Sequence, residues 1–387
     1  MRFPLSSPQA ISDDAIDAAV LSLRSGRHTM GPEVEAFERQ FAAYVGSQHA
    51  VMVNSGSSAN LLAVEAMRRP SDQKPRWVRG DEILVPALAW STTVWPLVQA
   101  GLRPVFVDVN PVTLHMSVED AANKLSGNTC GLMLIHVLGI PANMDVVRDF
   151  CSDQALALIE DCCEAFGARW NGSSVGTFGK VGTFSHFYSH QLPTIEGGMC
   201  ITDDAAIADD LRSMRAHGWS RQRTDRKQWE DRSDIDPRFL FVTSGYNVRP
   251  MELQAAIGRQ QMRVFENVRR RHVQTACNIK AACDVLGWLE MLGWTSGPRR
   301  TWSWMNAPLR VKPNARLSRA AVVQTLEAAG IETRPIIAGN ITKHPAFAGY
   351  RTDCSVADDL MANGFMIGCH DPAIADALTE AVRAVAA

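Results

Sequence analysis

Residues 54–60 read NSGSSAN and follow a buried apolar run, residues 49–53, that ends where a helical pattern begins. Small residues at the start of a helix leave backbone N–H groups free, and such groups bind anions, most often a phosphate. The segment lacks the Gly-Lys-Ser/Thr of a Walker loop, so it does not predict that nucleotide site. The alternative is a helix N-cap with a tight turn and no ligand.

A carboxylate stands at the end of a later apolar run. Asp161 follows residues 156–159, and open α/β sheets bind ligands at the carboxyl edge of their strands. A carboxylate at that edge suits the protonated ring nitrogen of pyridoxal phosphate, which serves as an electron sink. A satisfied helix cap is the alternative for Asp161.

Residues 183–198 read TFSHFYSHQLPTIEGG, an apolar segment that leads into a polar turn with a Gly-Gly exit. A short strand is expected directly afterwards, at residues 199–201. A phosphate-binding turn, a strand-end Asp and a polar turn, in this order, are typical of fold-type-I pyridoxal phosphate enzymes. Those enzymes carry a lysine in the turn, whereas position 190 is a histidine, which cannot form a Schiff base.

The elements that must position these residues are short strands alternating with helices up to about residue 215. Residues 61–67 and 144–150 are expected to be helical. This alternation predicts an α/β fold with a mostly parallel sheet covered on both faces. Strands are expected at residues 49–53, 83–85, 105–109, 132–135 and 156–159.

The pattern changes after Gly245, where a second, smaller unit is expected. Residues 222–237 are strongly polar and predict an exposed loop. A long helix is expected from Met251, then a strand over residues 302–311 and a helix over residues 319–329 that Gly330 ends. We therefore predict a large domain, residues 1–250, and a small C-terminal α/β domain, residues 251–387. The long helix should carry its apolar face on Leu253, Ile257, Val264 and Val268.

The bulk composition of the 387 residues argues against several partners. A net charge of −2 gives no electrostatic case for nucleic acid or an anionic membrane, and the basic run at residues 269–272 is interpreted as a solvated helix face. The chain starts without the apolar core of a signal peptide and holds no apolar run of membrane-spanning length, so we expect a cytoplasmic protein. Nine cysteines without a CxxC pair predict no metal site and no iron–sulfur cluster.

Over nearly its whole length the chain resembles the DegT/StrS-type sugar aminotransferases, and among them the 3-dehydratases that lead to colitose. The resemblance implies a fold-type-I, aspartate aminotransferase-like fold and a homodimer whose two-fold interface shares the active site. The matching blocks, in order, are HTMG (28–31), NSGSSAN (54–60), AWSTT (89–93), DCCE (161–164), RAHGW (215–219), GYNVRP (245–250) and GIETRP (330–335).

The resemblance also implies which residues hold the cofactor. The backbone of Gly56 and Ser57, together with Ser185, would bind its phosphate, and Asn247 would reach the same phosphate from the partner subunit. Trp90 would stack on the pyridine ring.

Further residues are assigned by the same resemblance. Asp161 would pair with the ring nitrogen, and Glu164 would lie near the ring hydroxyl, where the aminotransferases often have Gln. His217, Arg249 and Arg334 are candidates for contacts with the substrate or with glutamate, because the arginine fork binds carboxylate and phosphate. Read without the resemblance, each arginine is a member of a surface ion pair.

His190 occupies the position of the covalent lysine, and none of the seven lysines lies in the motif. The 3-dehydratases also carry a histidine there. The resemblance therefore implies pyridoxamine 5'-phosphate held without a covalent bond, with His190 as the base and then the acid of a C3 dehydration. The substrate would be a nucleotide-linked 4-keto-6-deoxyhexose, with GDP-4-keto-6-deoxy-D-mannose favoured and CDP, dTDP or UDP sugars open. L-Glutamate would restore the amine.

Two other functions stay open at this point: a nucleotide-sugar aminotransferase that works without the covalent lysine, and a cofactor-binding scaffold without turnover.

One departure from the resemblance concerns the residue after His190. The 3-dehydratases read Ser-His-His, whereas this chain reads Ser189-His190-Gln191. If a second ring assists the elimination, Gln191 predicts slower turnover or another substrate. His186 is expected to be a packed core histidine.

Overall fold

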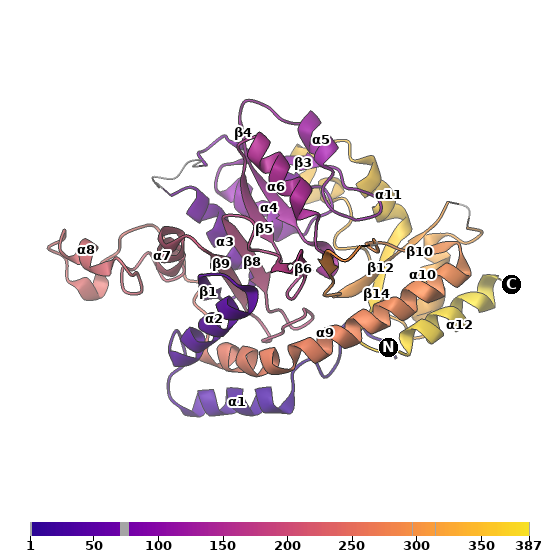
Figure 1. Cartoon of the computed structure of the whole chain (residues 1–387), viewed down its shortest axis with the longest axis horizontal. Helices are drawn as coiled ribbons and strands as arrows, with labels where there is room; N and C mark the ends of the chain where they lie inside the picture. The colour runs from indigo at the N-terminus through magenta and orange to yellow at the C-terminus, as the bar shows by residue number, and fades with distance from the viewer. Residues whose placement is uncertain (1, 70–76, 296, 314, 387) are drawn as a thin grey trace.

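A seven-stranded sheet forms the centre of the molecule in a computed structural model that describes residues 2–69, 77–295, 297–313 and 315–386 (Figure 1). Strand β9 pairs antiparallel with both of its neighbours, and the other four pairings are parallel. The predicted mostly parallel sheet is therefore confirmed. In spatial order the strands are β1 (His49–Val53), β9 (Gly198–Thr202), β8 (Val181–Ser185), β5 (Ala157–Asp161), β4 (Thr129–Ile135), β2 (Glu82–Pro86) and β3 (Arg103–Val107).

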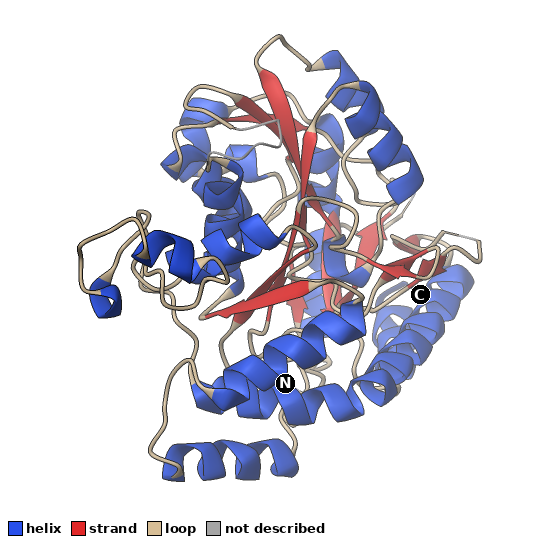
Figure 2. Ribbon diagram, turned by 60° about the vertical axis from the view of Figure 1, so that its left-hand side comes forward, coloured by secondary structure: helices blue, strands red, loops and turns tan. Residues whose placement is uncertain are grey.

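Both faces of this sheet are buried, as Figure 2 shows by the helices on its two sides. Successive side chains of a strand point to opposite faces, so the apolar run in β4 supplies two cores. Met133 belongs to the same buried cluster as Leu62 of α3 (Gly56–Met67), whereas Leu134 belongs to a separate cluster with Val147 of α6 (Met144–Asp153). The remaining helices before residue 215 are α1 (Asp13–Arg24), α2 (Pro32–Val45), α4 (Ser91–Gln99), α5 (Val118–Asn123) and α7 (Ala205–Met214).

Local hydrogen bonds explain where two elements differ from the prediction. Helix α3 begins at Gly56 rather than Leu61, because the Ser55 hydroxyl caps it by accepting from the Ser58 N–H. Strand β3 ends at Val107 rather than at residue 109, because Val109 pairs with Met116 in an isolated bridge.

Helix α9 (Glu252–Leu286) connects the central sheet to a second, four-stranded antiparallel sheet (Figure 1). Residues 3–5 add to this C-terminal part: Phe3 bridges Ile331, and the Leu5 N–H donates to Glu332. The division at residue 250 stays a prediction. The second sheet and its helices are β10 (Leu289–Met291), β12 (Asn306–Val311), β14 (Gly364–Gly368), β13 (Thr333–Arg334), α10 (Arg319–Ala328), α11 (Ser355–Asn363) and α12 (Ile374–Ala386).

Three surface predictions need correction. Val264 is 40% exposed although the periodicity of α9 placed it with Ile257 on the apolar face. The predicted loop at residues 222–237 contains a short helix, α8 (Arg226–Glu230), in a segment that projects from the body (Figure 1). In the basic run, Arg269 and His272 donate to the carbonyls of Trp302 and Trp304, so only part of that run is solvated. None of the described helices is long and apolar enough to cross a membrane.

Candidate functional site

A cavity of about 390 Å³ opens at the carboxyl end of the central strands, and we call it the cofactor cavity. Its volume lies in the range of about 300–1,000 Å³ that small-molecule sites occupy. Met305, Ile337 and Met366 line it from the C-terminal part of the chain. It brings together seven of the eleven residues singled out from the sequence: Gly56, Ser57, Trp90, Asp161, Glu164, Ser185 and His190.

The first turn of α3 lies against the end of β8 and forms one wall. A Cβ atom added to Gly56 would lie 2.6 Å from the Ser185 Cβ and 2.9 Å from the Cys163 Sγ. A Cβ atom on Gly198 would lie 2.2 Å from the Ser55 carbonyl oxygen, which explains the second glycine of the Gly-Gly exit. The first N–H groups of a helix have no partners within it, so this wall offers donors suited to a phosphate.

Replacing Gly56 with alanine tests this wall. The added methyl group should weaken pyridoxal phosphate binding and lower the unfolding free energy by about 1–3 kcal/mol, because it has no room beside Ser185 and Cys163. Thermal unfolding with and without pyridoxal phosphate would measure both effects. Gly127→Ala is the matched control, since nothing lies within 4 Å of a Cβ atom there. Equal shifts in the two variants would contradict the prediction.

Asp161 is 4% exposed and ends β5 at the cavity. Its Oδ2 accepts from Asn60 Nδ2 and Thr93 Oγ1, both at 2.8 Å, and its Oδ1 accepts from the Cys163 N–H at 3.1 Å. Residues 162–168 form turns, so the helix-cap alternative is wrong. The sequence reasoning missed Asn60 and Thr93, although both lie in the segments NSGSSAN and AWSTT at the start of helices.

Glu164 lies in the turn after β5 and lines the cavity, and a residue outside this turn binds its carboxylate. Its Oε2 accepts from the Leu138 N–H at 2.9 Å. Burial raises the pKa of the Glu164 carboxyl to about 7, and the charge of Asp161 adds to this rise. The raised pKa makes the protonated form accessible near neutral pH, and in that form the carboxyl can donate a hydrogen bond.

Because its pKa is raised from 4.5 to about 7, Glu164 should make stability depend on pH. Folding favours the protonated form, so this contribution is complete below pH 4.5 and is lost as the pH rises towards 7. Relative to Glu164→Gln, the wild-type protein should lose about 1–3 kcal/mol of unfolding free energy between pH 5 and pH 8. Denaturant unfolding of the cofactor-free proteins at both pH values would measure it, and parallel behaviour of the two proteins would refute it.

His190 lies in the polar turn, and its ring contacts the Phe187 ring edge-on, with 5.8 Å between centroids. Burial lowers the pKa of the imidazole to about 4, and the smaller opposing effects come from the backbone of Cys163 and the charge of Asp161. The ring is therefore neutral at pH 7 and can accept a proton. Its Nδ1 is buried without a partner among the described residues.

His186 supports this turn from the core. It is fully buried between Phe37 and Phe41, and its Nδ1 lies 3.1 Å from the Leu192 carbonyl oxygen. Its backbone closes the turn, because the His186 N–H donates to Gly197 and the His186 carbonyl accepts from the Thr194 N–H. The prediction of a packed core histidine is confirmed.

Four of the predicted site residues lie outside the lining of the cofactor cavity. Asn247 and His217 are exposed, and the Asn247 Oδ1 accepts from the Arg249 Nε at 2.9 Å. Arg334 has an exposed side chain at the end of strand β13 and pairs with Glu332 at 2.5 Å. A single chain therefore does not bring these residues to the cavity, because their segments lie on its outer surface.

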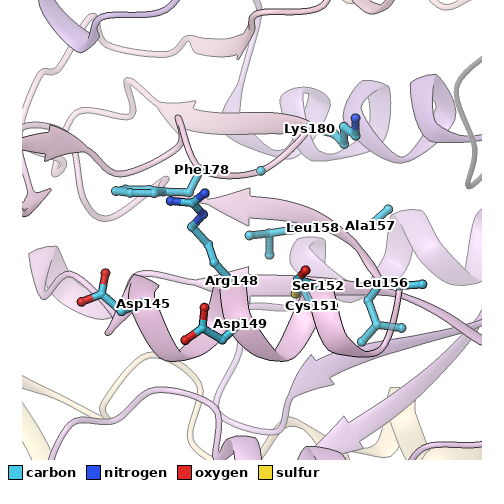
Figure 3. A pocket seen from close by; sticks show the side chains of 12 residues that line it. Asp145, Arg148, Asp149, Cys151, Ser152, Leu156, Ala157, Leu158, Phe178 and Lys180 are labelled. Atoms are coloured by element: carbon cyan, nitrogen blue, oxygen red, sulfur yellow. The ribbon is translucent and has the colours of Figure 1, made fainter.

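The described lysines also lie outside the cofactor cavity, and Lys74 lies outside the described residues. Lys180 is exposed and borders a separate, open hollow of about 710 Å³. Figure 3 shows this hollow between α6 and the segment Phe178 to Lys180, with Asp145, Arg148 and Asp149 on the helix. It adjoins the beginning of β5, the end of the strand opposite Asp161.

His136, Glu160 and Cys162 place three potential metal ligands within 4.8 Å of one another. Their contacts favour a structural network instead. The Glu160 carboxylate accepts from the N–H groups of residues 176, 178 and 179 and lies 3.0 Å from His136 Nε2, while the Ala142 N–H donates to His136 Nδ1. Burial raises the pKa of the Cys162 thiol well above its usual range, which disfavours the thiolate that metals bind. The absence of a metal stays a prediction.

Comparisons with known proteins give a consistent result. The profile of the DegT/DnrJ/EryC1/StrS aminotransferase family matches residues 9–386. GDP-4-keto-6-deoxy-D-mannose 3-dehydratase from Yersinia pseudotuberculosis is 35% identical over 381 residues, 96% of this chain and 94% of that protein, and the enzyme from Escherichia coli O55:H7 is 37% identical over 382 residues, 96% of each. A crystal structure of GDP-4-keto-6-deoxymannose-3-dehydratase with a trapped PLP–glutamate geminal diamine has a TM-score of 0.90 at 35% identity, covering 98% of this chain and 99% of that one.

Proposed function

The chain belongs to the DegT/DnrJ/EryC1/StrS aminotransferase family, and we propose that it is a pyridoxamine phosphate-dependent 3-dehydratase of GDP-4-keto-6-deoxy-D-mannose. The predicted fold of pyridoxal phosphate-dependent transferases is confirmed by the solved structures to which the chain is similar. The observation that carries the proposal is His190, which faces the same cavity as Asp161 while the described lysines lie elsewhere.

The cavity fits the cofactor. Gly56 lets the first turn of α3 lie close against Ser185 and Cys163, which places its N–H groups where a phosphate could bind. Trp90 offers a flat apolar face, and the buried Asp161 carboxylate suits a protonated ring nitrogen. When bound, pyridoxamine phosphate supplies the amine that reacts with the C4 ketone and a ring that accepts electrons. Since no lysine of the described residues lines the cavity, the cofactor is held non-covalently.

Different residues of the chain then carry out the proton transfers and the binding of the cofactor. His190, neutral at pH 7, would accept a proton from the C4′ carbon of the bound cofactor and return it to the C3 hydroxyl oxygen, which leaves as water. Asp161 stays fixed beside the ring site by its three donors. The product released is a 4-keto-3,6-dideoxy sugar together with ammonia. L-Glutamate restores the aminated cofactor, as the related structure with PLP and glutamate supports.

A homodimer with a shared site is part of the proposal. Trp90, Tyr188 and Ile195 expose large apolar surfaces around the cofactor cavity and its turn. Asn247 and Arg249 lie outside the cavity of their own chain and would serve the partner's cavity. Apolar side chains gathered at an exposed site favour burial by another subunit.

Mass spectrometry of GDP-4-keto-6-deoxymannose after incubation with the protein, pyridoxal phosphate and L-glutamate tests the function. Loss of the C3 oxygen is expected, and it should require glutamate. A product that keeps this oxygen and gains an amine would establish the aminotransferase alternative. Unchanged sugar, with cofactor bound, would reject the proposed substrate, and the same assay with the CDP, dTDP and UDP sugars would then identify the nucleotide.

A further inference from the structure

Gln191 follows His190 directly, yet its side chain does not line the cofactor cavity. It is 7% exposed, and its Nε2 donates to the carbonyl oxygen of Glu164 and, at 2.9 Å, to that of Ser303. One amide group therefore joins the turn of His190 to two segments that lie far away in the sequence. Two carbonyl acceptors on one side fix the orientation of the amide, because only its NH₂ group can donate.

These contacts close a ring of hydrogen bonds beside the cavity, which Glu164 lines. The Leu138 N–H donates to the Glu164 carboxylate. The carbonyl of Gly139, which follows Leu138 in the chain, accepts from the Ser303 N–H at 2.9 Å. Gln191 completes the ring by binding Glu164 and Ser303. Glu164 is consequently held at both its side chain and its backbone, and the backbone of His190 is tied to the same ring through Gln191.

We propose that Gln191 is a positioning residue that sets the His190 imidazole and the Glu164 carboxyl relative to each other across the cofactor cavity. The inference rests on the proposed function for the roles of these two groups. It also changes the interpretation of the sequence Ser189-His190-Gln191. Residue 191 does not supply a second acid or base in this chain, since its amide NH₂ group donates to two backbone carbonyls.

The chemistry of the amide explains why glutamine suits this place. Its nitrogen carries two hydrogens at every pH, whereas a neutral imidazole donates only once and donates twice only when charged. A glutamate of the same shape would turn a carboxylate towards two carbonyl oxygens. A neutral imidazole at this place has one donor for two carbonyl oxygens, so Gln191→His should keep only one of the two hydrogen bonds.

The decisive variants are Gln191→Met and Gln191→Glu, which keep the length of the side chain and lose the donor. Both should lower kcat for dehydration about 10- to 100-fold with the KM for the nucleotide sugar within about twofold, because small misplacement of reacting groups costs rate. In the cofactor-free protein, hydrogen exchange at the Leu138 and Ser303 amides should become faster. Gln261→Met is the matched control, because the Gln261 amide is 5% exposed and donates to the Ala10 carbonyl at 2.6 Å outside this ring.

Wild-type exchange rates at both amides and unchanged kcat in a folded Gln191→Met protein would overturn the inference. Should that variant fail to fold, Gln191→Asn keeps the NH₂ group on a shorter side chain, and it must show faster exchange at the same two amides. The exchange measurement needs no sugar substrate. A wild-type protein that leaves GDP-4-keto-6-deoxymannose unchanged would reject the proposed function, while the exchange data would still decide the role of Gln191.

Discussion

The His190→Asn protein should form the 3-deoxy product about 10²- to 10⁴-fold more slowly than wild type, the range over which a positioned acid–base group acts. Asparagine has nearly the reach of the imidazole but cannot take up a proton. Binding of pyridoxal phosphate should change little, because the phosphate wall and Asp161 are untouched. Single-turnover dehydration measured by mass spectrometry would give the rate. His49→Asn, at the start of β1 and outside the cofactor cavity, is the control.

His190→Lys extends this test by restoring the residue that the aminotransferases of the family carry. Borohydride should attach the cofactor covalently to this variant and leave it removable from the wild-type protein. The variant should lose dehydration, since lysine captures the aldehyde form of the cofactor. Covalent trapping on the wild-type chain, or unchanged 3-deoxy product from the lysine variant, would reject the role assigned to His190.

The Asp161→Asn protein should lose at least about 100-fold in kcat, because an amide cannot neutralise a protonated ring nitrogen as a carboxylate does. Charge-assisted hydrogen bonds contribute about 1.5–3 kcal/mol each, so the loss of charge beside Asn60 and Thr93 should also lower stability. Absorbance titration with pyridoxal phosphate and thermal unfolding would separate the two effects.

Asp203→Asn is the control for this substitution, because the Asp203 carboxylate accepts from a backbone N–H on the exposed surface. It should leave cofactor affinity and kcat unchanged. Glutamate at position 161 keeps the charge but is one methylene longer, so it should recover part of the cofactor affinity. An asparagine variant with the affinity and kcat of wild type would show that Asp161 does not serve the ring.

Local sequence signals were sufficient for many parts of the site. The Ser55 cap, the strand that ends at Asp161 and the Gly-Gly exit of the turn depend on residues within a few positions of one another. The continuous apolar run in β4 likewise predicts a strand buried on both faces. Such features follow from backbone geometry and near-neighbour hydrogen bonds, which a sequence pattern records directly.

Other parts could not be predicted because they depend on long-range contacts. Asn60 and Thr93 reach Asp161 across 101 and 68 positions, and Gln191 reaches Ser303 across 112. The sequence indicated only that these residues were polar. Their partners follow from the order of the parallel strands and the close approach of residues 138–139 to residues 303–305.

The sequence by itself predicted the groups that we propose to carry the chemistry: a turn suited to a phosphate, a strand-end carboxylate, and a histidine in place of the covalent lysine. The tertiary structure decided the environment in which these groups act. Burial lowers the pKa of His190 to about 4 and raises that of Glu164 to about 7, because both groups lose water when the cavity walls pack around them. Desolvation depends on atoms supplied by distant segments, among them Met305 and Ile337. No local pattern around either residue contains that information.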